Sequence, residues 1–183
     1  CIRDRAMTQG ELVLKHVHPA SMQMVLDKLI EAGMSIQADE KTITASMRER
    51  TKPVDIRTLP YPGFPTDMQA QFVSMNAVAQ GNSRVIENIF ENRFMHVPEL
   101  TRMGAAIEIQ GNVALIDGVE RLSGATVMAT DLRASASLVI AGLVAEDETT
   151  IEQISHLDRG YQKIEEKLGK ICLLYTSPSP RDR

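Results

Sequence analysis

Two segments of this 183-residue chain begin with closely similar residues, Thr66-Asp67-Met68-Gln69-Ala70 and Thr130-Asp131-Leu132-Arg133-Ala134. Each leads into an apolar run typical of a helix, then a run typical of a strand, then an arginine, Arg93 in the first and Arg159 in the second. Self-similarity at this spacing indicates that one structural unit is used more than once. The repeat puts a carboxylate at two helix starts and a guanidinium one strand later, which suits an anionic substrate.

A second pattern, Leu-x-x-x-Gly-x-x-Ile, occurs at residues 29–36 and 100–107. It is typical of a helix that ends on a glycine in the left-handed conformation before the chain turns into a strand. A third copy would start at Leu168 and need glycine at position 172, where Cys172 stands. The pattern therefore breaks where the composition changes to a Ser/Pro/Arg-rich tail.

The two ends are expected to be foreign to the protein. Residues 1–5 and 172–183 look like translated adapter sequence, so we expect the genuine domain to span residues 6–171. The two cysteines, Cys1 and Cys172, both lie in these ends, which leaves the expected domain without a disulfide. The expected lack of a disulfide fits a reducing cytoplasm.

Composition narrows the class of protein. A net charge of −4 argues against a nucleic-acid-binding surface, although a few convergent arginines can still bind a small anion. The longest apolar run, Leu138–Ala145, is far shorter than a membrane span, and the N-terminus shows no signal peptide.

Hydrophobic periodicity and turn residues predict an alternation of helices and strands. We expect helices at 22–32, 67–79, 98–103, 131–145 and from about 160, and strands at 11–17, 35–37, 42–45, 54–59, 84–90, 106–109, 113–116, 126–128 and 149–154.

The carboxylates at the two helix starts each have a structural and a functional interpretation. Thr66-x-x-Gln69 has the form of a capping box, in which Asp67 would favour the positive helix end. The rigid Pro-Gly-Phe-Pro loop before Thr66 instead favours a carboxylate that accepts a proton from a substrate hydroxyl. Asp131 has the same two interpretations, and Arg133, unfavourable so near a helix N-terminus, indicates an anionic or carboxylate partner.

Arg93 and Arg159 are either surface arginines paired with their neighbouring acids or forks that grip a carboxylate or phosphate. His16 and His18 alternate on one strand and could chelate a metal, but without a third ligand nearby ordinary surface histidines are the better interpretation.

Four stretches, Pro65–Phe72, Phe90–Leu100, Ala129–Ala136 and His156–Tyr161, together resemble the UDP-N-acetylglucosamine 1-carboxyvinyltransferases. This family of enolpyruvyl transferases opens bacterial peptidoglycan synthesis. The resemblance covers about residues 6–171. It implies an α/β fold in which two similar domains, each an inside-out α/β barrel of three repeated βα units, enclose the active site, and this chain would be most of the C-terminal domain.

The resemblance also implies a role for each matching residue. Asp67 would contact the sugar 3-hydroxyl as the candidate base, and Asp131, with Arg133 beside it, would lie near the reacting carbon. Ile89 would meet the sugar through its backbone. Arg93 and Arg159 would hold the carboxylate and phosphate of phosphoenolpyruvate. No metal or organic cofactor is implied.

Two alternatives stay open. One is the related shikimate-pathway enolpyruvyl transferase, which shares the architecture but not these four stretches. The other is a non-catalytic nucleotide-sugar-binding domain. In the family, the N-terminal half supplies the loop with the general-acid cysteine and the phosphate-gripping lysine and arginine, so this chain alone is expected to be inactive.

Overall fold

The structure is a computed structural model, which describes residues 6–161 and 163–169. The segments expected to be foreign, 1–5 and 172–183, and the expected break of the repeat at Cys172 lie outside these described residues.

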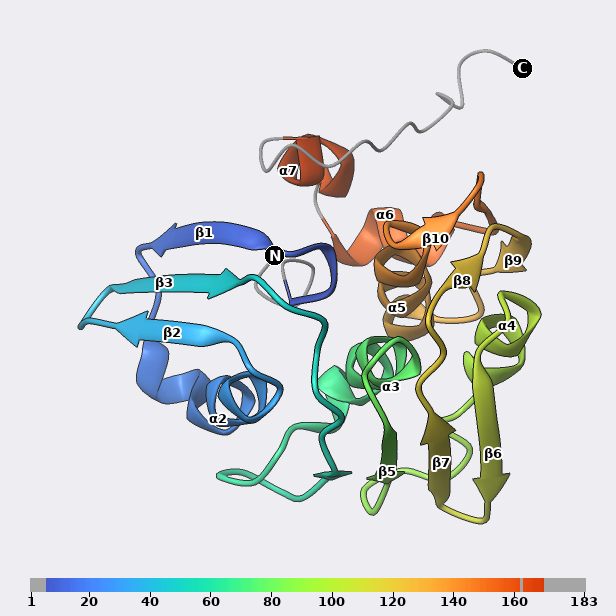
Figure 1. Ribbon diagram of the computed structural model, residues 1–183, viewed down its shortest axis with the longest axis horizontal. Coiled ribbons are helices and arrows are strands. Elements are labelled where there is room, and N and C mark those ends of the chain that lie inside the picture. Colours follow the sequence, from blue (N-terminus) through green and yellow to red (C-terminus); the bar gives the residue numbers. More distant parts are fainter. Residues whose placement is uncertain (1–5, 162, 170–183) are drawn as a thin grey trace.

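Two consecutive units share one strand order (Figure 1). In each, the first strand pairs antiparallel with the third, which also forms a hairpin with the second. The order is β1-β3-β2 in one unit and β5-β7-β6 in the other, as the repeat predicts. The elements are β1 (Gly10–Lys15), α2 (Gln23–Glu31), β2 (Ser35–Ala38) and β3 (Thr42–Met47), then β5 (Asn82–Ile86), α4 (Val97–Arg102), β6 (Ala106–Gln110) and β7 (Val113–Asp117).

A buried helix connects each unit to the next through a pair of parallel strands. Helix α3 (Gln69–Ala77) connects β4 (Ile56–Arg57) to β5, and α5 (Leu132–Gly142) connects β9 (Thr126–Met128) to β11 (Thr150–Glu152). A second short parallel pair joins β8 (Leu122–Ser123) to β10 (Ala145–Glu146). Two 3-10 turns, η1 (Pro19–Met22) and η2 (Thr66–Met68), precede α2 and α3, and helices α6 (Ser155–Gly160) and α7 (Ile164–Gly169) follow β11.

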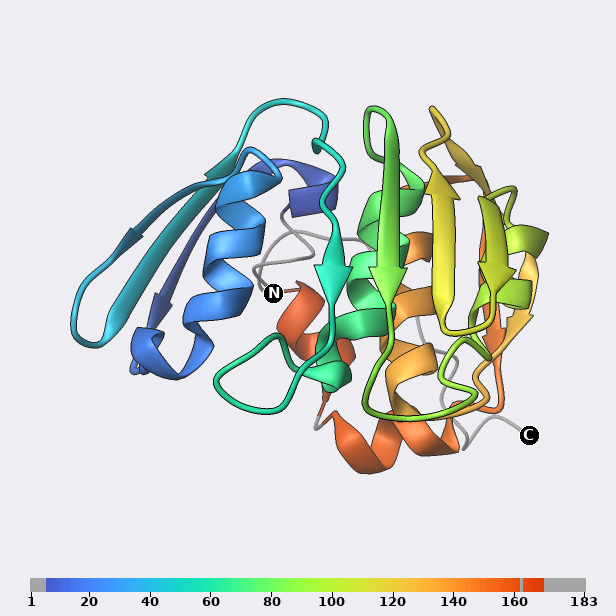
Figure 2. The same cartoon turned by 90° about the horizontal axis from the view of Figure 1, so that it is seen from below.

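Helices α3 and α5 pack against each other in the interior. Every residue of α3 and residues 134–141 of α5 are buried, the pattern of a helix surrounded by protein. The polar residues of α3 are used to link elements: Ser74 Oγ donates to the Ser137 carbonyl (3.0 Å), and the Asn76 amide pairs with both backbone groups of Val54. Figure 2 shows the three-stranded sheet and α2 at one end of the molecule and the four-stranded sheet covering α3 and α5 at the other.

With α3 and α5 buried behind the four-stranded sheet, this part of the chain has the inside-out arrangement expected of the repeated units, whereas α2 keeps an exposed face. The sheets do not close into a complete barrel within the described residues.

The helix-ending glycines behave as their shared pattern predicts. Gly33 and Gly104 have positive φ angles of 101° and 92°. In both copies the residue after the glycine donates its backbone N–H to the leucine carbonyl that starts the pattern, at 3.0 Å. These paired bonds satisfy the last carbonyls of α2 and α4 and turn the chain into the next strand.

Several element boundaries differ from the expectation. The strand expected at 54–59 is only Ile56–Arg57, because the Asn76 side chain takes the backbone bonds of Val54. The strand expected at 84–90 ends at Ile86, since the Glu87 carboxylate takes the next free N–H groups. Helix α5 ends at Gly142 rather than 145. The helix expected from about 160 is α7, which begins at Ile164, and α6 before it was not expected.

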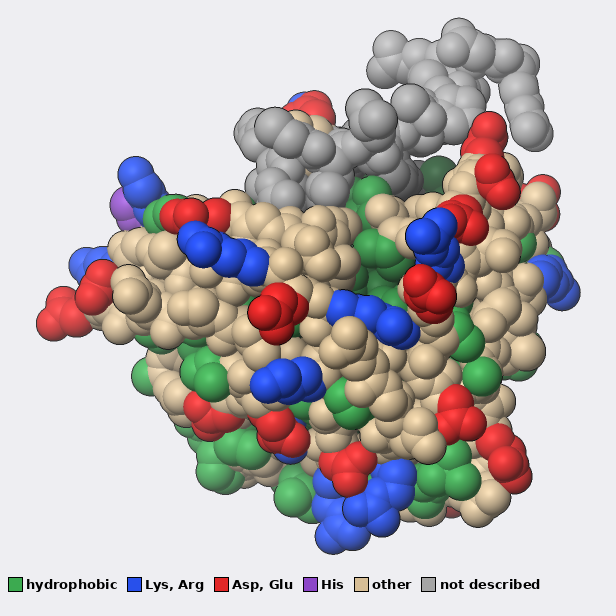
Figure 3. Space-filling model, in the orientation of Figure 1, with side chains coloured by type: hydrophobic (Ala, Val, Ile, Leu, Met, Phe, Trp, Pro, Cys, Tyr) green, Lys and Arg blue, Asp and Glu red, His purple; other side chains and the backbone are tan. Residues whose placement is uncertain are grey.

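Charges of both signs are interspersed over the face shown in Figure 3. This surface suits a protein of small net charge. Among the described residues, no helix combines the length and apolar character needed to cross a bilayer.

Candidate functional site

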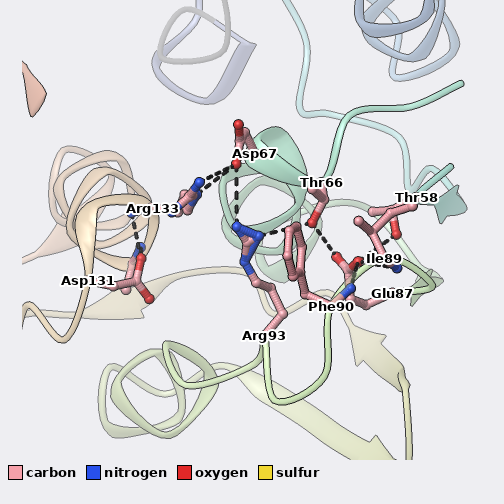
Figure 4. Close-up of polar contacts among 10 residues, drawn as sticks. Thr58, Thr66, Asp67, Glu87, Ile89, Phe90, Arg93, Asp131 and Arg133 are labelled. Atoms are coloured by element: carbon pink, nitrogen blue, oxygen red, sulfur yellow. Dashed lines mark hydrogen bonds and ion pairs between the residues drawn. The ribbon is translucent and has the colours of Figure 1, made fainter. Parts of the chain in front are cut away.

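Asp67 lies between two arginines that come from different parts of the chain (Figure 4). Its Oδ1 accepts from Arg133 Nε at 2.7 Å and lies 2.6 Å from Arg133 Nη2, so one fork of the guanidinium faces the carboxylate. Arg93 Nη2 approaches the same oxygen at 3.4 Å. We call Asp67, Arg93 and Arg133 the Asp67 cluster. It brings a carboxylate and two fixed cations to one point, as a site for an anionic substrate requires.

The 3-10 turn η2 determines how Asp67 is presented. Because Thr66–Met68 form this turn, the helix proper starts only at Gln69 and has no side-chain cap. The expected capping box is therefore wrong. The Thr66 hydroxyl bonds to Glu87 instead, and Gln69 is fully buried with no hydrogen-bond partner found for its amide among the described residues. Asp67 is left projecting from the turn, with 64% of its side chain exposed.

Arg93 is held from several sides. Its side chain is only 16% exposed, its guanidinium lies 4.5 Å from the centre of the Phe90 ring, and Nη1 donates to Thr66 Oγ1 at 3.3 Å. The interpretation of Arg93 as a solvated surface arginine is therefore wrong. A fork fixed in this way loses less conformational freedom when it binds an anion.

Asp131 caps α5. Its backbone is extended (φ −154°), and Oδ1 accepts from the backbone N–H groups of Arg133 (2.7 Å) and Ala134 (3.1 Å). The structural interpretation of Asp131 is thus confirmed. The cap also fixes the carboxylate at the start of the helix that carries Arg133, close to the Asp67 cluster.

Arg159 and Ile89 come from two further segments of the chain. Arg159 is exposed on α6, where its Nε donates to the Ser155 carbonyl (3.3 Å). Its neighbour Gly160 is so close to α5 that a Cβ there would lie 2.0 Å from Leu132, the first residue of α5. Ile89 lies in the segment after β5, and its backbone N–H donates to Glu87. Among the residues that the resemblance assigns to the substrates, the structure brings Arg93 and Arg133 into contact with Asp67.

The local sequence patterns missed two buried residues. Glu87, only 2% exposed, connects the segment carrying Ile89 to Thr66. His96, 1% exposed, precedes α4; burial lowers its pKa to about 4, although the negative charge of Asp131 acts in the opposite direction. Neither residue belongs to a spacing that marks a site, and Glu87 falls inside the strand expected at 84–90.

A groove of about 830 Å³ opens beside Arg93. Its walls are mainly apolar and include the side chains of Phe90, Phe94, Met95 and Ile109. Such a volume can hold a small organic ligand.

Metal binding finds no support in the described residues. His16 and His18 are both exposed, and no group of three or more His, Cys, Asp or Glu side chains there is arranged to hold an ion. The expectation that these histidines are ordinary surface residues agrees with this exposure.

Comparison with known proteins relates the chain to one family. The family model for EPSP synthase (3-phosphoshikimate 1-carboxyvinyltransferase) matches residues 5–168. A UDP-N-acetylglucosamine 1-carboxyvinyltransferase from Hamiltonella defensa subsp. Acyrthosiphon pisum (strain 5AT) is 57% identical over 167 residues, which are 91% of this chain. The match spans 40% of that relative's length.

Solved structures give the same fold. The enolpyruvyl transferase NikO from Streptomyces tendae superposes with a TM-score of 0.83 and 26% identity, over 97% of this chain and 43% of NikO. An EPSP synthase from Acinetobacter baumannii superposes with a TM-score of 0.63 and 15% identity, over 81% of this chain and 37% of that enzyme, and supports the fold alone.

Proposed function

The chain belongs to the EPSP synthase family, and from this membership we propose that it is part of an enzyme that transfers the enolpyruvyl group of phosphoenolpyruvate to the 3-hydroxyl of UDP-N-acetylglucosamine. The choice of acceptor is supported by the 57% identity to a UDP-N-acetylglucosamine 1-carboxyvinyltransferase. The protein would then act in bacterial peptidoglycan synthesis in the cytoplasm.

The observation that carries the proposal is the pairing of Asp67 with Arg93 and Arg133. A carboxylate that projects from a rigid turn can accept the proton of the acceptor hydroxyl as its oxygen attacks. The ion pairs with Arg93 and Arg133 hold the Asp67 carboxylate in place before the substrate binds, and Arg133 is the closer partner, at 2.6 Å. We assign Asp67 as the general base.

The arginines supply the second half of the chemistry. Phosphoenolpyruvate carries a carboxylate and a phosphate, and planar guanidinium forks bind both groups through paired N–H donors. Arg93 and Arg133 face the position of Asp67, and Arg159 lies on the helix that packs against the start of α5. We assign all three to the anionic substrate, with Asp131 a fixed charge near the reacting carbon and the Ile89 backbone a contact to the sugar.

The reaction proceeds by addition and elimination. The 3-hydroxyl oxygen bonds to C2 of phosphoenolpyruvate, its proton passes to Asp67, and C3 gains a proton from a general acid. C3 then returns a proton to the conjugate base of that general acid as the C2–O bond to phosphate breaks, which restores the C2–C3 double bond, forms the enol ether and releases inorganic phosphate. Positioning and charge stabilisation account for the role of these residues in both steps.

The chain spans 40% of the relative's length, so we propose that residues outside it supply the general acid and further phosphate contacts. Residues 6–171 would then form part of the C-terminal domain, with the active site on the face that carries the Asp67 cluster.

The test measures phosphate release from phosphoenolpyruvate by the complete protein, obtained by extending the coding sequence in its source genome. Activity is expected with UDP-N-acetylglucosamine and not with shikimate 3-phosphate. Asp67→Asn should lower kcat by about 10²–10⁴-fold, the usual contribution of general base catalysis.

The matched control is Asp55→Asn, which changes an exposed carboxylate that is ion-paired with Arg84 away from the cluster. This variant should keep wild-type turnover. Preference for shikimate 3-phosphate, or full activity in Asp67→Asn, would refute the proposal.

A further inference from the structure

A buried carboxylate lies directly behind the Asp67 cluster. Glu87 follows the last residue of β5 and is only 2% exposed. Its own backbone is fixed as well, since its N–H donates to the Asn112 carbonyl (2.9 Å) and its carbonyl accepts from the Asn112 side chain (3.0 Å). Burying a carboxylate is costly unless hydrogen bonds compensate for the lost water.

Four donors surround this carboxylate (Figure 4). Oε1 accepts from Thr58 Oγ1 (2.8 Å) and from the backbone N–H groups of Ile89 (2.9 Å) and Phe90 (3.2 Å). Oε2 accepts from Thr66 Oγ1 at 2.8 Å. The side chain therefore ties three separate segments together: the residues after β4, the turn η2 and the segment that follows β5.

The bond to Thr66 continues into the cluster. A hydroxyl has one proton, and because Thr66 gives that proton to Glu87, its lone pairs are turned toward Arg93. Arg93 Nη1 donates to this oxygen at 3.3 Å, and Nη2 of the same guanidinium approaches Asp67. Removing either Glu87 or the hydroxyl breaks the continuous path from the buried carboxylate to the Arg93 fork.

We propose that Glu87 is a positioning residue for the enolpyruvyl transfer: through Thr66 it sets the direction of the Arg93 fork, and through two N–H groups it sets the backbone at Ile89. This inference rests on the proposed function. Misplacement of a binding group by about 1 Å can cost about 10²-fold in rate, so a residue that touches no substrate can still determine catalysis.

The first experiment compares Thr66→Ser with Thr66→Val in the complete protein. Serine keeps the hydroxyl and should preserve both KM values and kcat. Valine has nearly the same shape but no hydroxyl, so Arg93 and Glu87 each lose a partner. We expect the KM for phosphoenolpyruvate to rise by about tenfold or more in Thr66→Val.

Glu87→Gln tests the carboxylate itself. An amide offers its NH2 group where the carboxylate accepted, so at least one of the four donors is left poorly paired. We expect the KM for phosphoenolpyruvate to rise as in Thr66→Val, and binding of UDP-N-acetylglucosamine, measured by calorimetry, to weaken because the Ile89 backbone is released.

Asn76→Ala is the control for a purely structural role. It removes the buried bonds to Val54 and should lower the thermal midpoint at least as much as Thr66→Val does, while both KM values stay within about twofold of wild type. If Glu87→Gln does not fold, the Thr66 pair still decides the question.

The outcomes separate the two proposals. An inactive wild-type protein refutes the proposed function. If the wild type is active but Thr66→Val keeps its KM for phosphoenolpyruvate within about twofold of wild type, the positioning role alone is refuted. The same holds if Asn76→Ala raises that KM as much as Thr66→Val does.

Discussion

Acid should destabilise the folded chain through His96. The side chain is 1% exposed, and its burial lowers the pKa to about 4 from an ordinary value of 6.5, against the opposing effect of the Asp131 charge. Between these two values the unfolded chain binds a proton that the folded chain does not. The stability that depends on neutral His96 is therefore fully present above about pH 6.5 and is lost as the pH drops toward 4.

The size of the effect follows from the two pKa values. A difference between 6.5 and about 4 corresponds to about 3 kcal/mol, because each pH unit is worth about 1.4 kcal/mol. Urea unfolding followed by circular dichroism, at steps from pH 7 to pH 4, measures this loss. His96→Gln cannot titrate here, so its stability should fall by about 3 kcal/mol less than that of the wild type over the same range.

His18→Gln is the matched control, because it removes an exposed histidine and should leave the wild-type pH dependence intact. The quantity compared is the difference in stability loss between the variants, which isolates the contribution of His96. Equal losses in the wild type and in His96→Gln would refute the reasoning.

Three further substitutions test the packing that positions the site, each by urea unfolding. Gly118→Ala should destabilise the chain by about 3 kcal/mol or more, since the new Cβ would lie 1.9 Å from the Ala79 carbonyl oxygen; a loss below about 1 kcal/mol would contradict this. Gly104→Ala meets no atom within 4 Å but keeps a φ of 92°, so its loss should be near 1 kcal/mol and clearly smaller than that of Gly118→Ala. Arg50→Met removes a guanidinium that donates to the carbonyls of Val78, Ala79 and Val119, and should cost about 2 kcal/mol or more; an unchanged midpoint would show that these bonds do not matter.

The repeat was predictable because it depends on local chemistry. A glycine that must adopt positive φ leaves a signal in a few residues, and both copies at Gly33 and Gly104 have the expected bonds. The order of strands follows from the repetition. The strand ends were less predictable, since side chains from elsewhere in the fold decide them, as Asn76 decides the length of β4.

The site was only partly predictable. The carboxylate partner of Arg133 was expected from electrostatics at a helix start, but its identity was not, because Asp67 is 66 residues away in the sequence. Glu87 gave no signal, since an acidic residue in an apolar strand usually points to solvent. Only the fold shows that it points inward to four donors.

The two similar segments that start with Thr66-Asp67 and Thr130-Asp131 differ in local structure, and the Asp67 cluster depends on this difference. Helix α5 starts directly after Asp131, so the Asp131 carboxylate serves as its N-cap and accepts hydrogen bonds from two backbone N–H groups. Asp67 instead lies within the 3-10 turn Thr66–Met68, and Met68 is the N-cap of α3. Asp67 pairs with Arg133, which occupies in the second copy the position that Gln69 has in the first. The two similar helix starts lie close enough for Arg133 at one of them to pair with the Asp67 carboxylate at the other, and this pairing is what the proposed binding of an anionic substrate depends on.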